Sequence, residues 1–177
     1  MLKKIVFSFF SGLALVGSLS NSASAQTSGA QGFQVVVPTS LSITAPPTSA
    51  SLNHDETSNP QAFPPQTWAV RGNLRSGVNV NFTTATPFTL VGDDTFKRNA
   101  KLALAVGTTQ GTAAWTVGTA ADETNYVAGD NDAQVSVSSS GIGRASLNLT
   151  VSFVTDDFAT LAAGNYVTTV TGTIAAK

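Results

Sequence analysis

Residues 144–174 constrain the fold of this chain more than any other stretch. In the first half of the stretch, every second residue is apolar: Ala145, Leu147, Leu149, Val151 and Phe153. The residues between them are polar. Successive side chains of a β-strand point to opposite faces, so this pattern predicts a long strand with one buried face and one wet face.

The second half of the stretch predicts another strand over residues 166–174, with β-branched residues on both faces. One face carries Tyr166, Thr168, Val170, Gly172 and Ile174. The connection, residues 156–165, is long enough to cross from one sheet to another. Such a crossing is typical of a Greek-key sandwich.

The rest of the chain repeats short apolar alternations between turn residues, about nine strands in all at intervals near ten residues. No segment has a sustained helical period. We therefore predict an all-β protein, a single Ig-like, Greek-key β-sandwich over residues 33–177. Residues 46–66 hold five of the seven prolines and are predicted to form a long loop, of the kind that tends to be functional or disordered.

The N-terminus has the pattern of a secretory signal peptide. Lys3 and Lys4 precede an apolar run of about fifteen residues, shorter than the roughly twenty that span a bilayer, and Ala23-Ser24-Ala25 supplies a small-x-small cleavage site. We predict a signal peptide at 1–25, processing between Ala25 and Gln26, and a flexible lead at 26–32. The alternative is a retained membrane anchor. The predicted location is secreted: extracellular, or in the cell envelope (periplasm or surface), with no transmembrane segment in the mature chain.

Composition narrows the classes of partner. The chain has no cysteine, which excludes a lipoprotein anchor and structural disulfides. Removing Lys3 and Lys4 leaves seven basic residues against ten acidic ones, a formal charge of −3. We therefore expect no basic patch and no nucleic-acid partner.

The carboxylates suggest calcium but not catalysis. All ten occur as close pairs in predicted connections, and Asp130 and Asp132 have the best spacing for calcium, although acidic pairs also solvate turns. His54 is the only histidine, there is no Gly-x-Ser-x-Gly motif, and adjacent carboxylates do not give the separation that glycosidases need. We predict that the protein is not an enzyme and needs no cofactor, with calcium as the alternative.

The tryptophans and the N-terminal apolar residues are the remaining candidates. Trp68 and Trp115 would stack on a sugar if exposed, but each lies among alternating apolar residues, which favours the core. Phe33, Val35 and Val37 alternate ahead of Pro38. These three are expected to form either the first strand of the domain or a segment that pairs elsewhere.

Residues 161–174 resemble the C-terminal strand of exported bacterial β-sandwich surface proteins, the spore coat U-type and related chaperone–usher pilin subunits. The resemblance rests on Gly164-x-Tyr166 followed by alternating threonine and valine. In that family an N-terminal extension donates a strand to the neighbouring subunit. The resemblance implies such a role for Phe33, Val35 and Val37.

Together these features predict a non-catalytic structural or cell-surface protein that associates through strand edges with itself or with other envelope proteins, as a fibre, matrix or envelope component. The alternative is an extracellular carbohydrate- or ligand-binding module that uses the 46–66 loop and an exposed aromatic residue.

Overall fold

The computed structural model describes residues 27–177. The predicted signal peptide and the junction between Ala25 and Gln26 lie outside the described residues. The chain divides into two units between Val36 and Val37. In the first unit, residues 27–36 contain no strand or helix and their side chains are exposed.

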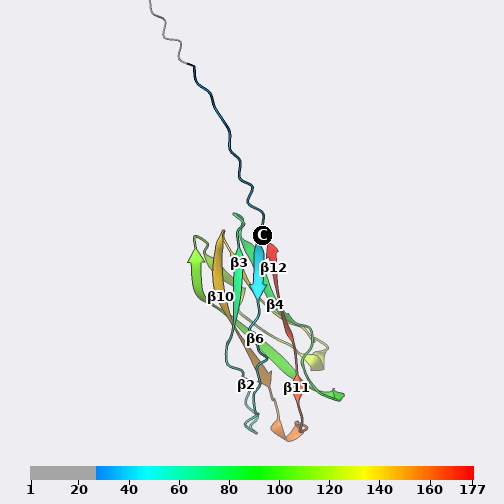
Figure 1. The fold of residues 1–177 in the computed structure, drawn as a ribbon. Helices are drawn as coiled ribbons and strands as arrows, with labels where there is room; N and C mark the ends of the chain where they lie inside the picture. The colour runs from blue at the N-terminus through cyan, green and yellow to red at the C-terminus, as the bar shows by residue number, and fades with distance from the viewer. Residues whose placement is uncertain (1–26) are drawn as a thin grey trace, which may run out of the picture. The chain divides into compact units, whose positions relative to one another are not determined.

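The second unit consists of two antiparallel sheets (Figure 1). The main path of the larger sheet runs β1 (Leu41–Thr44), β3 (Gln66–Gly72), β10 (Gly143–Val154), β6 (Asp93–Gly111), β5 (Phe88–Leu90), β11 (Tyr166–Val167). Two short strands complete it: β2 (Gln61–Ala62) beside β10, and β8 (Ala121–Glu123) beside β6. The smaller sheet runs β12 (Val170–Ala176), β4 (Val78–Thr84), β9 (Ala133–Ser139), β7 (Trp115–Thr119). Two single-turn 3-10 helices occur, η1 (Tyr126–Ala128) and η2 (Phe158–Thr160).

The prediction of an all-β sandwich is confirmed, but residues 27–177 contain twelve strands and not about nine. The strand predicted at 166–174 is in fact two. β11 pairs with β5 in the larger sheet, and β12 pairs with β4 in the smaller one. The chain therefore changes sheets at Thr168 and Thr169. No helix within residues 27–177 has the length and apolar character of a membrane span.

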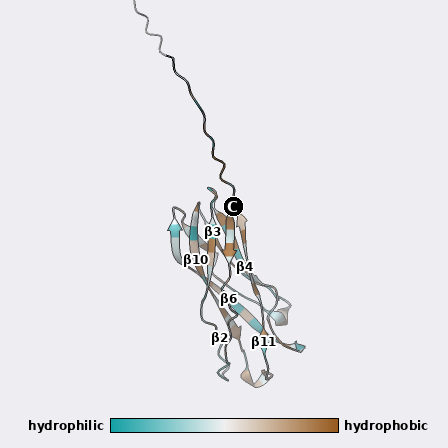
Figure 2. Ribbon diagram, in the orientation of Figure 1, coloured by the Kyte–Doolittle hydropathy of each residue, from teal (hydrophilic) through white to brown (hydrophobic). Residues whose placement is uncertain are grey.

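The main core lies between the two sheets. The alternation predicted for β10 is confirmed, because Ala145, Leu147 and Leu149 are buried. Figure 2 shows apolar and polar residues alternating along the strands. The other buried apolar residues of this core are Val70, Val78, Val80, Phe82, Leu102, Leu104, Ala133, Val135 and Val137. Full burial of one valine, leucine or phenylalanine side chain contributes about 1.5–3 kcal/mol, so this core is the main source of stability.

The two sheets differ in length. β6 has 19 residues and β10 has 12, whereas the strands of the smaller sheet have five to seven. A separate apolar cluster forms on the larger sheet, around Phe88 of β5, Ala100 of β6 and Phe153 of β10. Chain segments from outside the smaller sheet cover this second cluster, through Phe63, Leu161 and Tyr166.

Residues 33–37 are not the first strand of the domain. The first strand in the described residues is β1, which begins at Leu41. Pro38 cannot donate a ladder hydrogen bond, and its carbonyl oxygen instead accepts one from Asn73 Nδ2 at 2.8 Å. The alternative, that the segment pairs elsewhere, therefore stays a prediction.

β1 and β12 are edge strands of different sheets, and they lie side by side at Gly172. A Cβ atom at position 172 would lie 2.8 Å from Ile43 Cδ1, 2.9 Å from Trp68 Cζ3 and 3.1 Å from Phe82 Cε1. The first two distances are shorter than real Cβ contacts. Glycine at this position therefore lets the final strand close against the core.

We expect Gly172→Ala to destabilise the protein by about 1–3 kcal/mol, because the added methyl group overpacks this contact. Urea denaturation followed by tryptophan fluorescence measures the change. Thr171→Ala, on the exposed face of the same strand, is the control and should cost much less. Equal stability of the wild type and Gly172→Ala would contradict the close packing of the two edges.

Candidate functional site

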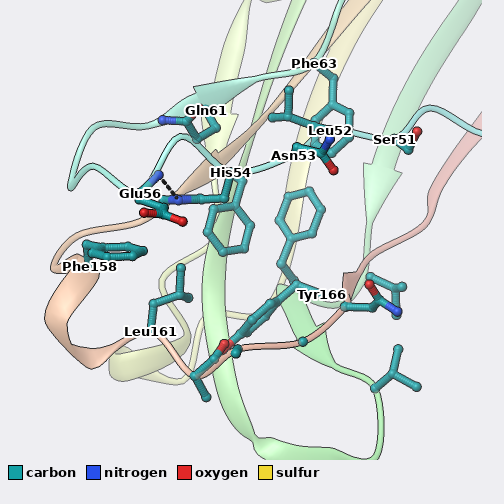
Figure 3. A pocket seen from close by; sticks show the side chains of 18 of the residues that line it. Ser51, Leu52, Asn53, His54, Glu56, Gln61, Phe63, Phe158, Leu161 and Tyr166 are labelled. Atoms are coloured by element: carbon teal, nitrogen blue, oxygen red, sulfur yellow. Dashed lines mark hydrogen bonds between the residues drawn. The ribbon is translucent and has the colours of Figure 1, made fainter.

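A cleft of about 760 Å³ lies beside the second apolar cluster. The proline-rich segment 46–66 (the prolyl loop) contributes one wall, with Leu52, Asn53 and His54, and residues 161–167 contribute the opposite wall (Figure 3). This volume falls within the range of about 300–1,000 Å³ that is typical of ligand sites. The segment 46–66, predicted to be one long loop, in fact contains β2 and the first residue of β3, and its residues 50–54 line the cleft.

Six aromatic rings lie in continuous contact in the cleft. Phe63 stacks on Phe88 at 5.9 Å between centroids, and Phe88 meets Phe153 edge to face at 5.2 Å. Phe153 also meets Tyr166 at 5.4 Å and His54 at 5.7 Å, and His54 stacks on Phe158 at 5.5 Å. Each such pair contributes about 0.5–1.5 kcal/mol beyond the burial of area. The rings therefore give the cleft a firm apolar floor.

His54 fastens the prolyl loop to this floor. Its Nδ1 accepts a hydrogen bond from the backbone N–H of Glu56 at 3.0 Å, so Nδ1 carries no proton. Its Nε2 is 2.8 Å from Thr155 Oγ1, and the Thr155 hydroxyl is 3.1 Å from the carbonyl oxygen of Asn59, to which it donates. These bonds favour the neutral tautomer with the proton on Nε2. His54 is therefore half-buried and hydrogen-bonded through both ring nitrogens.

A buried arginine holds the other wall. The Arg98 side chain donates from Nε to the carbonyl oxygen of Thr155 at 3.0 Å and from Nη2 to Thr160 Oγ1 at 2.8 Å. Its Nη1 donates to the carbonyl oxygen of Lys97 at 2.7 Å. Arg98 thereby ties β6 to the end of β10 and to η2. Thr155, which is fully buried, thus connects both walls of the cleft: its hydroxyl group bonds to His54, and its carbonyl oxygen accepts from Arg98.

The carboxylate of Asp55 orders the turn at the rim of the cleft. It accepts hydrogen bonds from the Thr57 hydroxyl at 2.7 Å and from Gln61 Nε2 at 2.6 Å. These bonds, that of Thr57 foremost, hold the pKa of Asp55 below its ordinary value. A lowered pKa means that the charged form stabilises the fold above the ordinary pKa. That stabilisation is lost as the pH falls through the lowered one.

The two tryptophans lie outside the cleft. Trp68 packs edge to face on Phe82 at 5.1 Å, and both Trp68 and Trp115 are half-buried against the main core. Trp115 Nε1 is buried without a hydrogen-bond partner. The rings that line the cleft are phenylalanine, tyrosine and histidine side chains from distant parts of the sequence, and alternation within a single segment does not reveal their convergence.

The predicted calcium pair lies in the turn before β9. The backbone N–H of Asp132 donates to Asp130 Oδ1 at 3.4 Å, and Asp130 forms a backbone bridge with Asn125. In the part of the chain that the structure describes, no three His, Cys, Asp or Glu side chains gather as a metal site would require. Asp130 and Asp132 have the arrangement of a hydrogen-bonded turn.

The geometry suits binding more than acid–base chemistry. Both nitrogens of His54 are engaged in structural hydrogen bonds, and the floor of the cleft is apolar. Comparison of the chain with protein-family models, with curated proteins and with solved structures gave no match. The function is therefore argued from the cleft and from the exposed surfaces.

We expect His54→Ala to destabilise the prolyl loop by about 2 kcal/mol, because it removes two hydrogen bonds of about 0.5–1.5 kcal/mol each and two ring contacts. Hydrogen–deuterium exchange of residues 50–60 measures this change. The control, His54→Phe, keeps the ring contacts and should lose about half as much. Unchanged exchange in His54→Ala would show that His54 does not fasten the loop.

Proposed function

We propose that this chain is an exported, non-catalytic structural subunit of the cell surface or envelope whose copies associate through strand edges. In this proposal, residues 33–37 of one copy lie as an added strand in the aromatic cleft of the next. The observation that carries the proposal is the exposure of four apolar side chains in this short segment.

The donor segment is apolar and has no strand partner in the described residues. Phe33 and Val35 are each 87% exposed, Val36 is 78% exposed and Val37 is 76% exposed. Phe33, Val35 and Val37 would share one face in a strand. Contiguous apolar surface of this kind marks an interaction site.

The acceptor is the cleft and the strand edge beside it. β11 has one ladder partner, β5, so one of its edges is open within the described residues. Val91 and Val167 at the cleft are 63% and 55% exposed. An added strand gains main-chain hydrogen bonds at an open edge and side-chain burial in the pockets beside it.

The reach of the chain directs the segment to a neighbouring copy. Pro38 is held at Asn73, beside the start of β10, whereas Phe153 of the cleft lies near the end of β10. At about 3.3 Å per residue these points are roughly 33 Å apart, and the five residues from Pro38 back to Phe33 span at most about 18 Å. The rings around Phe153 are therefore available to Phe33 of a different copy.

We expect Val35→Asp to weaken self-association of the mature chain at least tenfold, because a charge in the apolar face opposes burial. Sedimentation velocity over a range of concentrations measures the association. Gln34→Asp is the matched control, with the same charge on the opposite face, and should associate like the wild type. Equal association of Val35→Asp and Gln34→Asp would contradict the proposal.

Mixing two variants tests whether one copy donates the strand and the other accepts it. Val35→Asp keeps its cleft but lacks an effective donor, and Val91→Asp keeps its donor but has a charged cleft rim. Each variant alone should stay monomeric, and the mixture should form a one-to-one dimer and nothing larger. Large assemblies in the mixture would contradict donation in one direction.

A second candidate function is an extracellular carbohydrate-binding module, which the ring-lined cleft favours because exposed aromatic faces stack on sugars. A glycan array with the mature chain tests this candidate. Binding should be lost in Phe158→Ala, at the rim of the cleft, and kept in Val35→Asp. A mature chain that binds no glycan on the array would leave the structural proposal alone.

A further inference from the structure

Two arginines face each other across neighbouring strands at the end of the sandwich where β10 begins. Arg71 of β3 and Arg144 of β10 are direct cross-strand partners, and both are exposed. Directly opposed residues have Cβ atoms about 4.5–5.5 Å apart, and like charges at that distance repel. The pair lines a shallow polar hollow with Ser42, Thr108 and Gln110.

Neither arginine is neutralised within the described residues. Arg71 Nη2 donates to Ser40 Oγ at 2.7 Å, and the single ion pair between side chains of residues 27–177 is Lys101–Glu123 at 3.9 Å. A pair of unneutralised guanidinium groups beside hydroxyl and amide groups has the chemistry of a carboxylate-binding surface.

Two more cations lie at the same end, in or beside the turn that joins β3 to β4. Arg75 is in this turn, and the backbone N–H of Lys177 donates to the carbonyl oxygen of Gly77 at 3.2 Å. We call this set the basic end: Arg71, Arg75, Arg144 and Lys177. Alternation and net charge do not reveal this grouping, because these residues are far apart in sequence and the folded sheets bring them together.

All ten Asp and Glu side chains lie toward the other end. Asp93 and Asp94 begin β6, and Asp156 and Asp157 follow β10. Asp122 and Glu123 pair with residues of β6 that face the last part of β10. The loop holding Asp55 and Glu56 is bonded to Thr155 through His54. The turn of Asp130 and Asp132 adjoins Tyr126, whose backbone N–H donates to Asn99 Oδ1.

The two ends do not neutralise each other within one copy. β10 has 12 residues, so its ends are about 36 Å apart at roughly 3.3 Å per residue. The Debye length at physiological salt is about 8 Å. We call the six outermost carboxylates the acidic end: Asp55, Glu56, Asp93, Asp94, Asp156 and Asp157.

We propose that the basic end of one copy docks on the acidic end of the next, in a head-to-tail arrangement. This inference rests on the proposed function and gives the association its orientation. The acidic end adjoins the aromatic cleft, because Glu56 lines the cleft and Asp157 directly precedes its lining residue Phe158. The basic end is where the donor segment joins the sandwich, because Asn73 binds Pro38 and Arg71 binds Ser40. One contact between two copies therefore satisfies both the apolar segment and the charges.

A second copy fits this surface better than a polyanion. The whole chain has a net charge of −1, and ten carboxylates accompany the four cations of the basic end. Nucleic acid or an anionic membrane would be repelled by the rest of the molecule. A contact between unlike ends of identical copies is heterologous, so it builds a ring or an open filament.

The test is a charge reversal on the mature chain, with the association constant measured by sedimentation velocity at 50 mM and 500 mM NaCl. At 50 mM NaCl we expect the R71E/R144E variant to associate at least tenfold more weakly than the wild type. The wild type should itself weaken at 500 mM NaCl, because the contact depends on charge. The control K97E/K101E changes the net charge equally, but toward the acidic end, and should not weaken association.

A compensating variant completes the test. Asp156→Lys with Asp157→Lys should restore association when mixed with R71E/R144E, and circular dichroism melts establish that every variant is folded. If R71E/R144E associates like the wild type while Val35→Asp does not, the charge inference is overturned and strand donation stands. Absence of association in the wild type overturns both.

Discussion

The apolar face of β10 is the constraint on which both apolar clusters of the second unit depend. Its first half, Ala145 to Leu149, belongs to the core between the sheets, and Phe153 near its end belongs to the cluster beneath the cleft. The first half of β10 is thus covered by the smaller sheet. The end of β10 is covered by chain segments from outside that sheet. Continuous backbone pairing with β6 holds the two regions in register, except for the shift between Ala145 and Leu147.

The cleft follows from this difference in length. Where the smaller sheet covers the larger one, inward-facing apolar residues of both sheets pack together into the main core. Beyond it, the prolyl loop and residues 161–167 supply side chains to the rings of Phe88 and Phe153 but leave a space between them. The prolyl loop contains five prolines, which restrict its backbone, and His54 fastens it to Thr155, so the loop is held at the edge of that space.

The alternation of apolar and polar residues was sufficient to predict the sandwich, since this pattern depends only on residues close in sequence, such as Leu147 and Leu149. It could not show the division of the last strand into β11 and β12, because Thr168 and Thr169 are compatible with either sheet. It could not show the cleft either. Phe63, Phe88 and Phe153 meet only through the pairing of strands far apart in sequence. His54 gave no signal in sequence, because its partners Thr155 and Phe158 lie about a hundred residues away.

The charges illustrate the same limit in a different property. The net charge adds up the charges of the whole chain, so it does not tell where the charged side chains lie in the fold. Arg71 and Arg144 become neighbours only through the register of β3 with β10, and the carboxylate pairs collect because the fold brings the connections that carry them to the same end. Separation of charge along a sandwich costs little within one copy, since its ends lie several Debye lengths apart. In the proposed head-to-tail contact, the opposite ends of two copies come within a Debye length of each other, so the charge separation would act between copies and favour one relative orientation.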